Sequence, residues 1–138
     1  MLIRFFSLSF FAITLIILLS SSTEQASESE LSKLMRVMAD DMKKMKSSVD
    51  AGKPLKKWGK AYEEIKTATP SAESKKGEHF QEYANSFLTQ VNRMKVAETN
   101  LDLRPQYNLL VQTCIRCHET YCPGPISMLR KLKLPERK

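Results

Sequence analysis

The clearest chemical signature in the chain lies near its C-terminus, in Cys114, Cys117 and His118. The two cysteines are three positions apart and the histidine follows at once, which is the spacing typical of a c-type haem attachment site. On a helix such positions share one face, so both thiols can form thioethers with the two vinyl groups of one porphyrin. The imidazole of His118 can then bind the iron as its proximal axial ligand. We therefore expect one covalently bound haem c.

Other interpretations of the same residues have to be weighed. A thioredoxin-type redox motif expects a βαβ context, whereas this chain shows only helical patterns. A structural zinc site could use the same three residues together with Cys122. Such sites usually take ligands from two separated clusters, and the other histidine, His79, is isolated. A disulfide between Cys114 and Cys117 would leave His118 unexplained. Zinc and a plain disulfide remain the alternatives to haem.

The first 22 residues are predicted to be a secretory signal peptide, with cleavage between Ser22 and Ala26. A short cationic start, an apolar run over residues 5–19 and three serines at 20–22 support this. The apolar run is shorter than the roughly 20 residues of a spanning helix, so we expect no stable membrane insertion after cleavage; an uncleaved anchor is the alternative. Because haem is attached to c-type proteins outside the cytoplasm, the expected location is the bacterial periplasm.

The net charge of the chain indicates which kinds of partner it can bind. Twenty-two Lys and Arg against 15 Asp and Glu give a net charge of +7 over 138 residues. Such a balance suits an acidic redox partner protein or an anionic surface. Because the basic residues are scattered along the helices, nucleic acid is not expected as a partner. A homodimer is neither required nor excluded by the sequence.

Four amphipathic helices are predicted from the spacing of apolar residues. The first spans residues 30–51 and has apolar residues at alternating intervals of four and three positions. A second is predicted over residues 54–69, a third over 78–99, and a fourth, which carries the attachment motif, over 105–122. The apolar residues of the first helix are Leu31, Met35, Met38, Met42, Met45 and Val49.

Short links between these helices predict an all-α fold, an antiparallel up-and-down four-helix bundle over residues 27–122 with haem c attached on the last helix. Pro123 ends that helix. Residues 123–138 are predicted to form a basic C-terminal tail, in which a turn or two of helix can form around Met128, Leu129 and Leu132.

With the attachment motif on the last helix of such a bundle, the chain resembles the cytochrome c-prime family, the class II c-type cytochromes. The resemblance covers residues 28–121 and is carried by two stretches. One is C-I-R-C-H-E-T-Y, Cys114 to Tyr121, and the other is L-M-R-V-M-A-D-D-M in the first helix. The chain departs from the family at Cys122 and at Leu31, where many members have a basic residue.

The resemblance implies that one residue of the first helix faces the iron opposite His118 and decides the function. Family members with methionine there are low-spin electron carriers. Members with a noncoordinating residue are five-coordinate and bind nitric oxide or carbon monoxide. Matching the apolar repeat places Met35 at this position, with Met38 or Met42 as the fallback if the register slips by a turn. Methionines at this spacing are also common as core filling.

The resulting expectation is a periplasmic electron carrier, not an enzyme, with His118 and Met35 as the axial iron ligands. The alternative is a five-coordinate gas-binding protein of the same family. A histidine and methionine pair raises the reduction potential of a haem, and an iron with both axial positions filled is suited to electron transfer.

Overall fold

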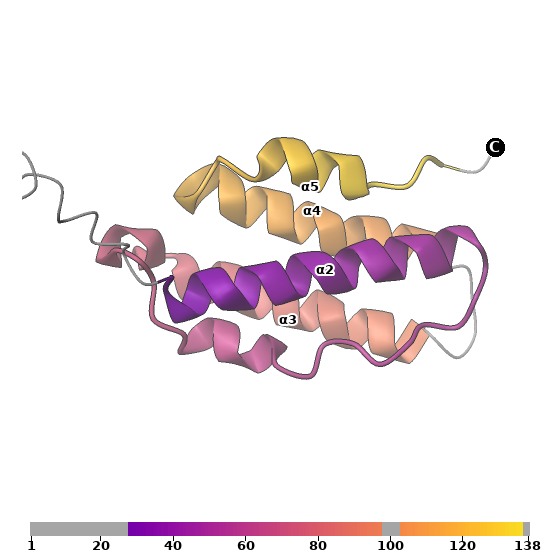
Figure 1. The fold of residues 1–138 in the computed structure, drawn as a ribbon, viewed down its shortest axis with the longest axis horizontal. Coiled ribbons are helices and arrows are strands. Elements are labelled where there is room, and N and C mark those ends of the chain that lie inside the picture. The colour runs from indigo at the N-terminus through magenta and orange to yellow at the C-terminus, as the bar shows by residue number, and fades with distance from the viewer. Residues whose placement is uncertain (1–27, 98–102, 137–138) are drawn as a thin grey trace, which may run out of the picture.

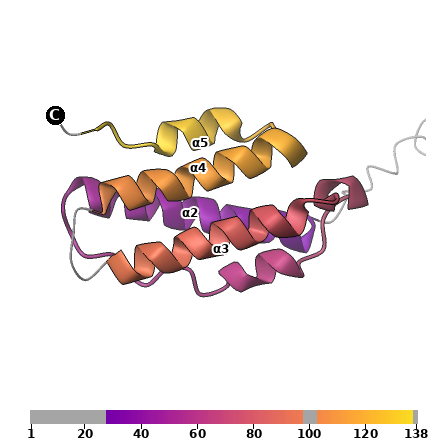
Figure 2. The same cartoon turned by 180° about the vertical axis from the view of Figure 1, so that it is seen from behind.

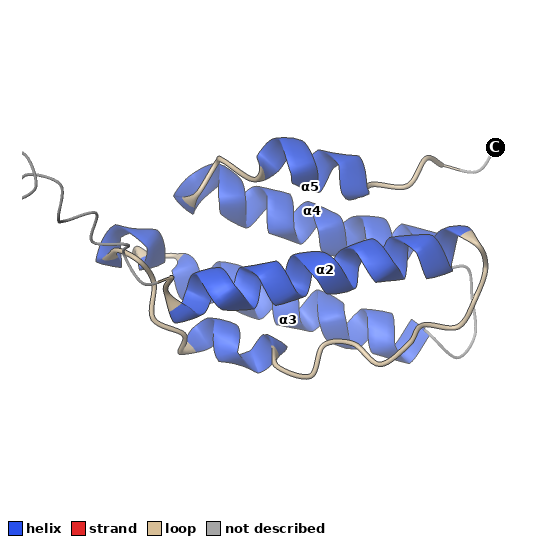
Figure 3. Cartoon of the chain, viewed as in Figure 1, coloured by secondary structure: helices blue, strands red, loops and turns tan. Residues whose placement is uncertain are grey.

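The structure is a computed structural model that describes residues 28–97 and 103–136. Four α-helices pack together in it, and no strand occurs among these residues (Figures 1 and 3). The predicted all-α class is therefore confirmed. The predicted signal peptide lies outside the described residues. The helices and the two short 3-10 helices are α2 (Glu30–Asp50), η1 (Tyr62–Lys66), η2 (Glu73–Lys76), α3 (Phe80–Ala97), α4 (Arg104–Tyr121) and α5 (Ile126–Leu132).

Helix α2 has the bounds that the apolar repeat predicted. It begins after Ser29, whose side-chain oxygen accepts a hydrogen bond from the backbone N–H of Ser32 at 3.2 Å and so caps the first turn. The acidic Glu30 in this turn suits the positive end of the helix dipole. One face of the helix is buried along its whole length. Its buried residues are Leu31, Leu34, Met38, Met42, Met45 and Val49.

Helix α4 lies antiparallel to both α2 and α3. At one end of the molecule Arg104, on α4, forms a salt bridge of 2.7 Å with Asp50, on α2. Further along, the hydroxyl of Tyr107 donates to the backbone oxygen of Met42 at 3.0 Å. Figure 2 shows α3 and α4 side by side from behind. The predicted third and fourth helices are thus confirmed as α3 and α4.

The predicted second helix over residues 54–69 is wrong. Only η1 is helical there, and the chain otherwise returns along the bundle in irregular form. Gly59 has φ of +70°, a conformation that breaks an α-helix. The carboxylate of Asp41 accepts hydrogen bonds from the Gly59 N–H at 3.3 Å and from the Tyr62 hydroxyl at 3.2 Å. These bonds to α2 stabilise the irregular path.

The fourth helix of the packed group is α5, so the motif-bearing α4 is not the last helix. Leu129, Leu132 and Leu134 are buried in the core. The side chain of Asn108, on α4, bonds both the N–H and the carbonyl of Leu134 at 2.9 and 2.8 Å. Residues 126–134 therefore pack on the bundle, where the sequence predicted a tail. No helix in the described part of the chain combines the length and apolar character needed to cross a membrane.

Candidate functional site

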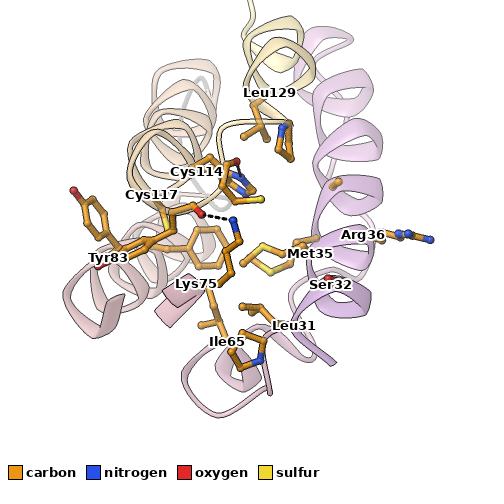
Figure 4. A pocket seen from close by; sticks show the side chains of 18 of the residues that line it. Leu31, Ser32, Met35, Arg36, Ile65, Lys75, Tyr83, Cys114, Cys117 and Leu129 are labelled. Atoms are coloured by element: carbon orange, nitrogen blue, oxygen red, sulfur yellow. Dashed lines mark hydrogen bonds between the residues drawn. The ribbon is translucent and has the colours of Figure 1, made fainter. Parts of the chain in front are cut away.

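One cavity of about 350 Å³ collects the residues that the sequence analysis singled out. Cys114, Cys117 and His118 line it from α4, and Met35 lines it from α2. In Figure 4, Met35 and the two cysteines lie on facing sides of this space. The cavity is at the end of the molecule where α2 begins and α4 ends. Packing of α2 against α4 thus brings the attachment motif and the proposed second iron ligand together.

Apolar side chains make up most of the cavity wall. They come from all four described α-helices and from η1, so no single element forms the site. A wall of this kind excludes water and suits a large apolar ligand with few polar groups. The apolar lining includes Leu31, Met38, Ala39, Met42, Ile65, Phe80, Phe87, Met128 and Leu129.

The two motif cysteines are half-buried and free of disulfides in the structure. Burial, with a smaller effect of the neighbouring Cys117, raises the pKa of the Cys114 thiol to about 12. Burial and the neighbouring Cys122 raise the pKa of Cys117 to about 11. Both groups are therefore neutral thiols near pH 7. A cysteine of the reactive redox type has a lowered pKa instead, because the thiolate is the nucleophile.

The ring of His118 is held by a hydrogen bond that the sequence analysis missed. Its Nδ1 lies 2.9 Å from the backbone oxygen of Cys122. A carbonyl oxygen only accepts, so Nδ1 carries the proton and Nε2 of the neutral ring has a free lone pair. Metal-binding histidines are commonly oriented in this way. The available signal in the sequence was Pro123. Proline has no backbone N–H to continue the helical hydrogen bonding, so α4 ends at Tyr121 and Cys122 follows as its C-cap.

The methionines of α2 differ in their surroundings. Met35 is half-buried, whereas Met38 and Met42 are 5% and 2% exposed, and all three line the cavity. Met45 is buried and does not line it. The structure therefore separates one core methionine from three that can reach a bound ligand. Met35 as the iron ligand, with Met38 or Met42 as the fallback, stays a prediction.

Aromatic rings fix the end of α4 that carries His118. The ring of Tyr121 makes edge contacts with Phe80 and Tyr83 of α3, at centroid distances of 5.8 and 5.9 Å. The Tyr83 hydroxyl lies 3.1 Å from the hydroxyl of Thr120. Such aromatic pairs add to the stabilisation from burial alone. They anchor the last turn of α4, and with it the histidine, against α3.

A short segment around η2 packs against the end of α4 that carries His118. The Nζ atom of Lys75 donates to the backbone oxygen of Tyr121 at 3.2 Å. A Cβ atom at Gly77 would lie 3.1 Å from the Tyr121 ring, so the backbone packs closely on that ring. Lys75 also lines the cavity. We call residues 73–77 the η2 segment.

The cavity residues fit the chemistry of a covalently held haem. Two neutral thiols and one correctly protonated imidazole come from the same helix, and thioether donors face them from another. The remaining lining is mostly apolar, as a porphyrin requires. By contrast, no group of three or more His, Cys, Asp and Glu side chains within residues 28–97 and 103–136 is placed to hold a metal ion. The zinc alternative therefore gains no support from the geometry.

Two other residues named in the sequence analysis, His79 and Cys122, differ in their position relative to the cavity. His79 is exposed beside Glu82, with 3.4 Å between its Nδ1 atom and the carboxylate, and it does not line the cavity. Cys122 is a half-buried free thiol at the end of α4 and is one of the residues that line the cavity.

Comparison of the chain with protein-family models, with curated proteins and with solved structures gave no significant match. The cavity and the residues that line it are thus the basis for assigning a function.

Proposed function

We propose that this protein is an exported c-type cytochrome that transfers electrons through one covalently bound haem. Cys114 and Cys117 would hold the haem as thioethers, and His118 and Met35 would be its axial ligands. The single observation that supports this proposal best is the shared cavity, in which the attachment motif and the methionines of α2 face each other. The periplasmic location follows from the predicted signal peptide.

The residues of the chain have separate roles in this proposal. The bond from Nδ1 of His118 to the Cys122 carbonyl would keep Nε2 directed at the metal. The apolar wall would exclude water. A site without water favours the iron state of lower charge, which is the reduced state. When bound, the haem would supply a one-electron iron couple. With both axial positions occupied by His118 and Met35, electron transfer is favoured over ligand binding.

The positive charge of the chain supports a transient partner of opposite charge. The net charge of +7 would steer association with an acidic redox protein and make its rate sensitive to salt. No substrate chemistry is part of this proposal.

An absorption spectrum of the purified protein tests the assignment. The chain is expressed with its signal peptide in a bacterium that attaches c-type haem, and haem content is measured as the pyridine haemochrome. We expect one haem per chain and, in the ferric protein, the weak long-wavelength band of methionine bound to iron. Met35→Ala should abolish this band and convert the low-spin spectrum to a high-spin one.

Met45→Ala is the matched control, because Met45 is on the same helix but does not line the cavity. Its spectrum should equal that of the unmodified protein. Loss of the band in Met38→Ala or Met42→Ala, but not in Met35→Ala, would move the axial role to that residue. A high-spin spectrum in the unmodified protein would instead favour the five-coordinate, gas-binding alternative.

A further inference from the structure

The charged groups on the cavity wall are unbalanced. Arg36 and Lys75 line the cavity, and no carboxylate among the described residues does. Arg36 is 76% exposed and already pairs with Glu28 through a contact of 2.9 Å. Lys75 is half-buried, and none of the ion pairs found in the described residues involves it. Among the described residues, Lys75 is therefore the basic side chain of this wall that has no carboxylate within ion-pair distance.

The position of Lys75 is fixed by the η2 segment. The backbone N–H of Lys75 donates to the carbonyl of Ala72 at 3.0 Å, and Gly77 accepts from the N–H of Phe80 at 2.9 Å. At its other end, the Lys75 ammonium group donates to the carbonyl of Tyr121. In Figure 4 this group points into the space between α2 and α4, close to the last turn of the motif-bearing helix.

The energy of this arrangement favours an anionic partner. A half-buried ammonium group next to an apolar wall has lost part of its hydration, and one neutral carbonyl compensates only part of that loss. An ammonium group has three donors, so it can bind a carboxylate while it keeps its bond to Tyr121. A molecule that fills this cavity and has a carboxylate at the Lys75 side would balance the charge.

We propose that Lys75 binds a propionate carboxylate of the haem and so fixes how the haem is oriented at the edge of the cavity. This inference rests on the proposed function, because the propionates are the acidic groups of that cofactor. Lys75 is a positioning residue in this proposal. It acts on the electrostatic environment of the iron and takes no part in its coordination.

The test compares three variants of the haem-loaded full chain. Lys75→Gln removes the charge but keeps an N–H donor for the Tyr121 carbonyl. Lys75→Arg keeps the charge. Lys76→Gln is the matched control, because Lys76 is on the same η2 segment, donates to the carbonyl of Lys66 at 3.2 Å and does not line the cavity. The measurements are the propionate bending band in the resonance Raman spectrum and the midpoint potential at pH 7.

We expect Lys75→Gln to shift the propionate band and to lower the midpoint potential, since loss of a nearby positive charge favours the ferric state. Lys75→Arg should restore both values, and Lys76→Gln should leave both unchanged. Lys75→Met provides a second neutral variant if the glutamine variant does not accumulate.

Two outcomes would overturn the inference, and they can be told apart. If the protein carries haem but Lys75→Gln and Lys76→Gln give the same band and potential, Lys75 does not bind a propionate, while the proposed function stands. If the unmodified protein contains no haem, both the inference and the proposed function fail.

Discussion

The two ends of the α2 and α4 pair differ in how their interior is filled. Where α2 ends and α4 begins, the interior is closed, and Tyr107, Leu110 and Val111 are 0% exposed. Where α2 begins and α4 ends, the same two helices surround a cavity, and Met35 and Cys114 are only half-buried. One stripe of methionines therefore forms core at one end and part of a cavity wall at the other.

The difference separates an end whose interior is fully packed from an end that has room for a ligand. Close packing at the closed end provides favourable contacts without any ligand. At the open end the facing side chains lack such contacts, and a bound cofactor would supply them. A cavity lined by thiols, an imidazole and thioethers is what the proposed haem site requires.

The largest effect is expected for the reactivity of Cys114 in protein prepared without haem. A pKa of about 12 in place of the ordinary 9.0 lowers the thiolate fraction at pH 8 about a thousandfold relative to the unfolded chain. Alkylation by iodoacetamide should slow accordingly and accelerate about tenfold per pH unit up to about pH 12. Mass spectrometry of the Cys114 peptide, with and without urea, measures both rates. Equal rates would show that the open end does not bury this thiol.

A second prediction compares methionines from the two ends of α2. Met45→Ala should lower the free energy of unfolding by about 3 kcal/mol, because it leaves a void in a closed core. Met35→Ala should cost about 1 kcal/mol or less in the chain without haem, since that side chain already borders a cavity. Urea unfolding followed by circular dichroism measures both values. Similar losses at the two positions would contradict the contrast between the ends.

The smallest effect is expected at the η2 segment. Gly77→Ala places a Cβ atom 3.1 Å from the Tyr121 ring, a strain that roughly offsets the entropic gain of about 0.4–1 kcal/mol from replacing a glycine. Its urea midpoint should stay nearly unchanged. Gly124→Ala is the control, because no atom lies within 4 Å of the new Cβ, and it should stabilise the protein slightly. A larger gain for Gly77→Ala than for Gly124→Ala would show that the η2 segment does not press on Tyr121.

Local patterns in the sequence were enough to predict α2, α3 and α4. A long apolar repeat that buries one face, a serine cap at the start and Pro123 at the end depend on neighbouring residues along the chain alone. These patterns therefore predict a helix whatever the helix packs against. The spacing of Cys114, Cys117 and His118, from which haem attachment is predicted, is local in the same way.

The prediction of the second helix was wrong because the apolar residues there are spaced to reach the core from an irregular segment. Trp58, Tyr62 and Ile65 do face the core or its edge, as the spacing required. They reach it from an irregular segment that Gly59 and the carboxylate of Asp41 stabilise. A glycine within an apolar repeat is a sign against a regular helix. Its partner Asp41, on α2, lies too far away in the sequence to be identified from the pattern.

The packing of residues 126–134 on the bundle was not predicted from the sequence, for a related reason. A seven-residue helix has too few turns to be stable alone, so its sequence gives only a weak signal. It forms in this structure because Leu129 and Leu132 are buried on the bundle and Asn108 bonds the backbone of Leu134 at both its polar groups. None of these contacts can be inferred from the segment itself.

By itself, the sequence determined the three long helices and the order of thiol, thiol and imidazole along one of them, since both depend on spacing within a few turns. The tertiary structure alone decided that Met35 faces that helix across a cavity, that Cys122 holds the histidine ring and that Lys75 reaches the cavity wall. The physical reason is that these relations join residues whose separation in space is set by how the helices pack.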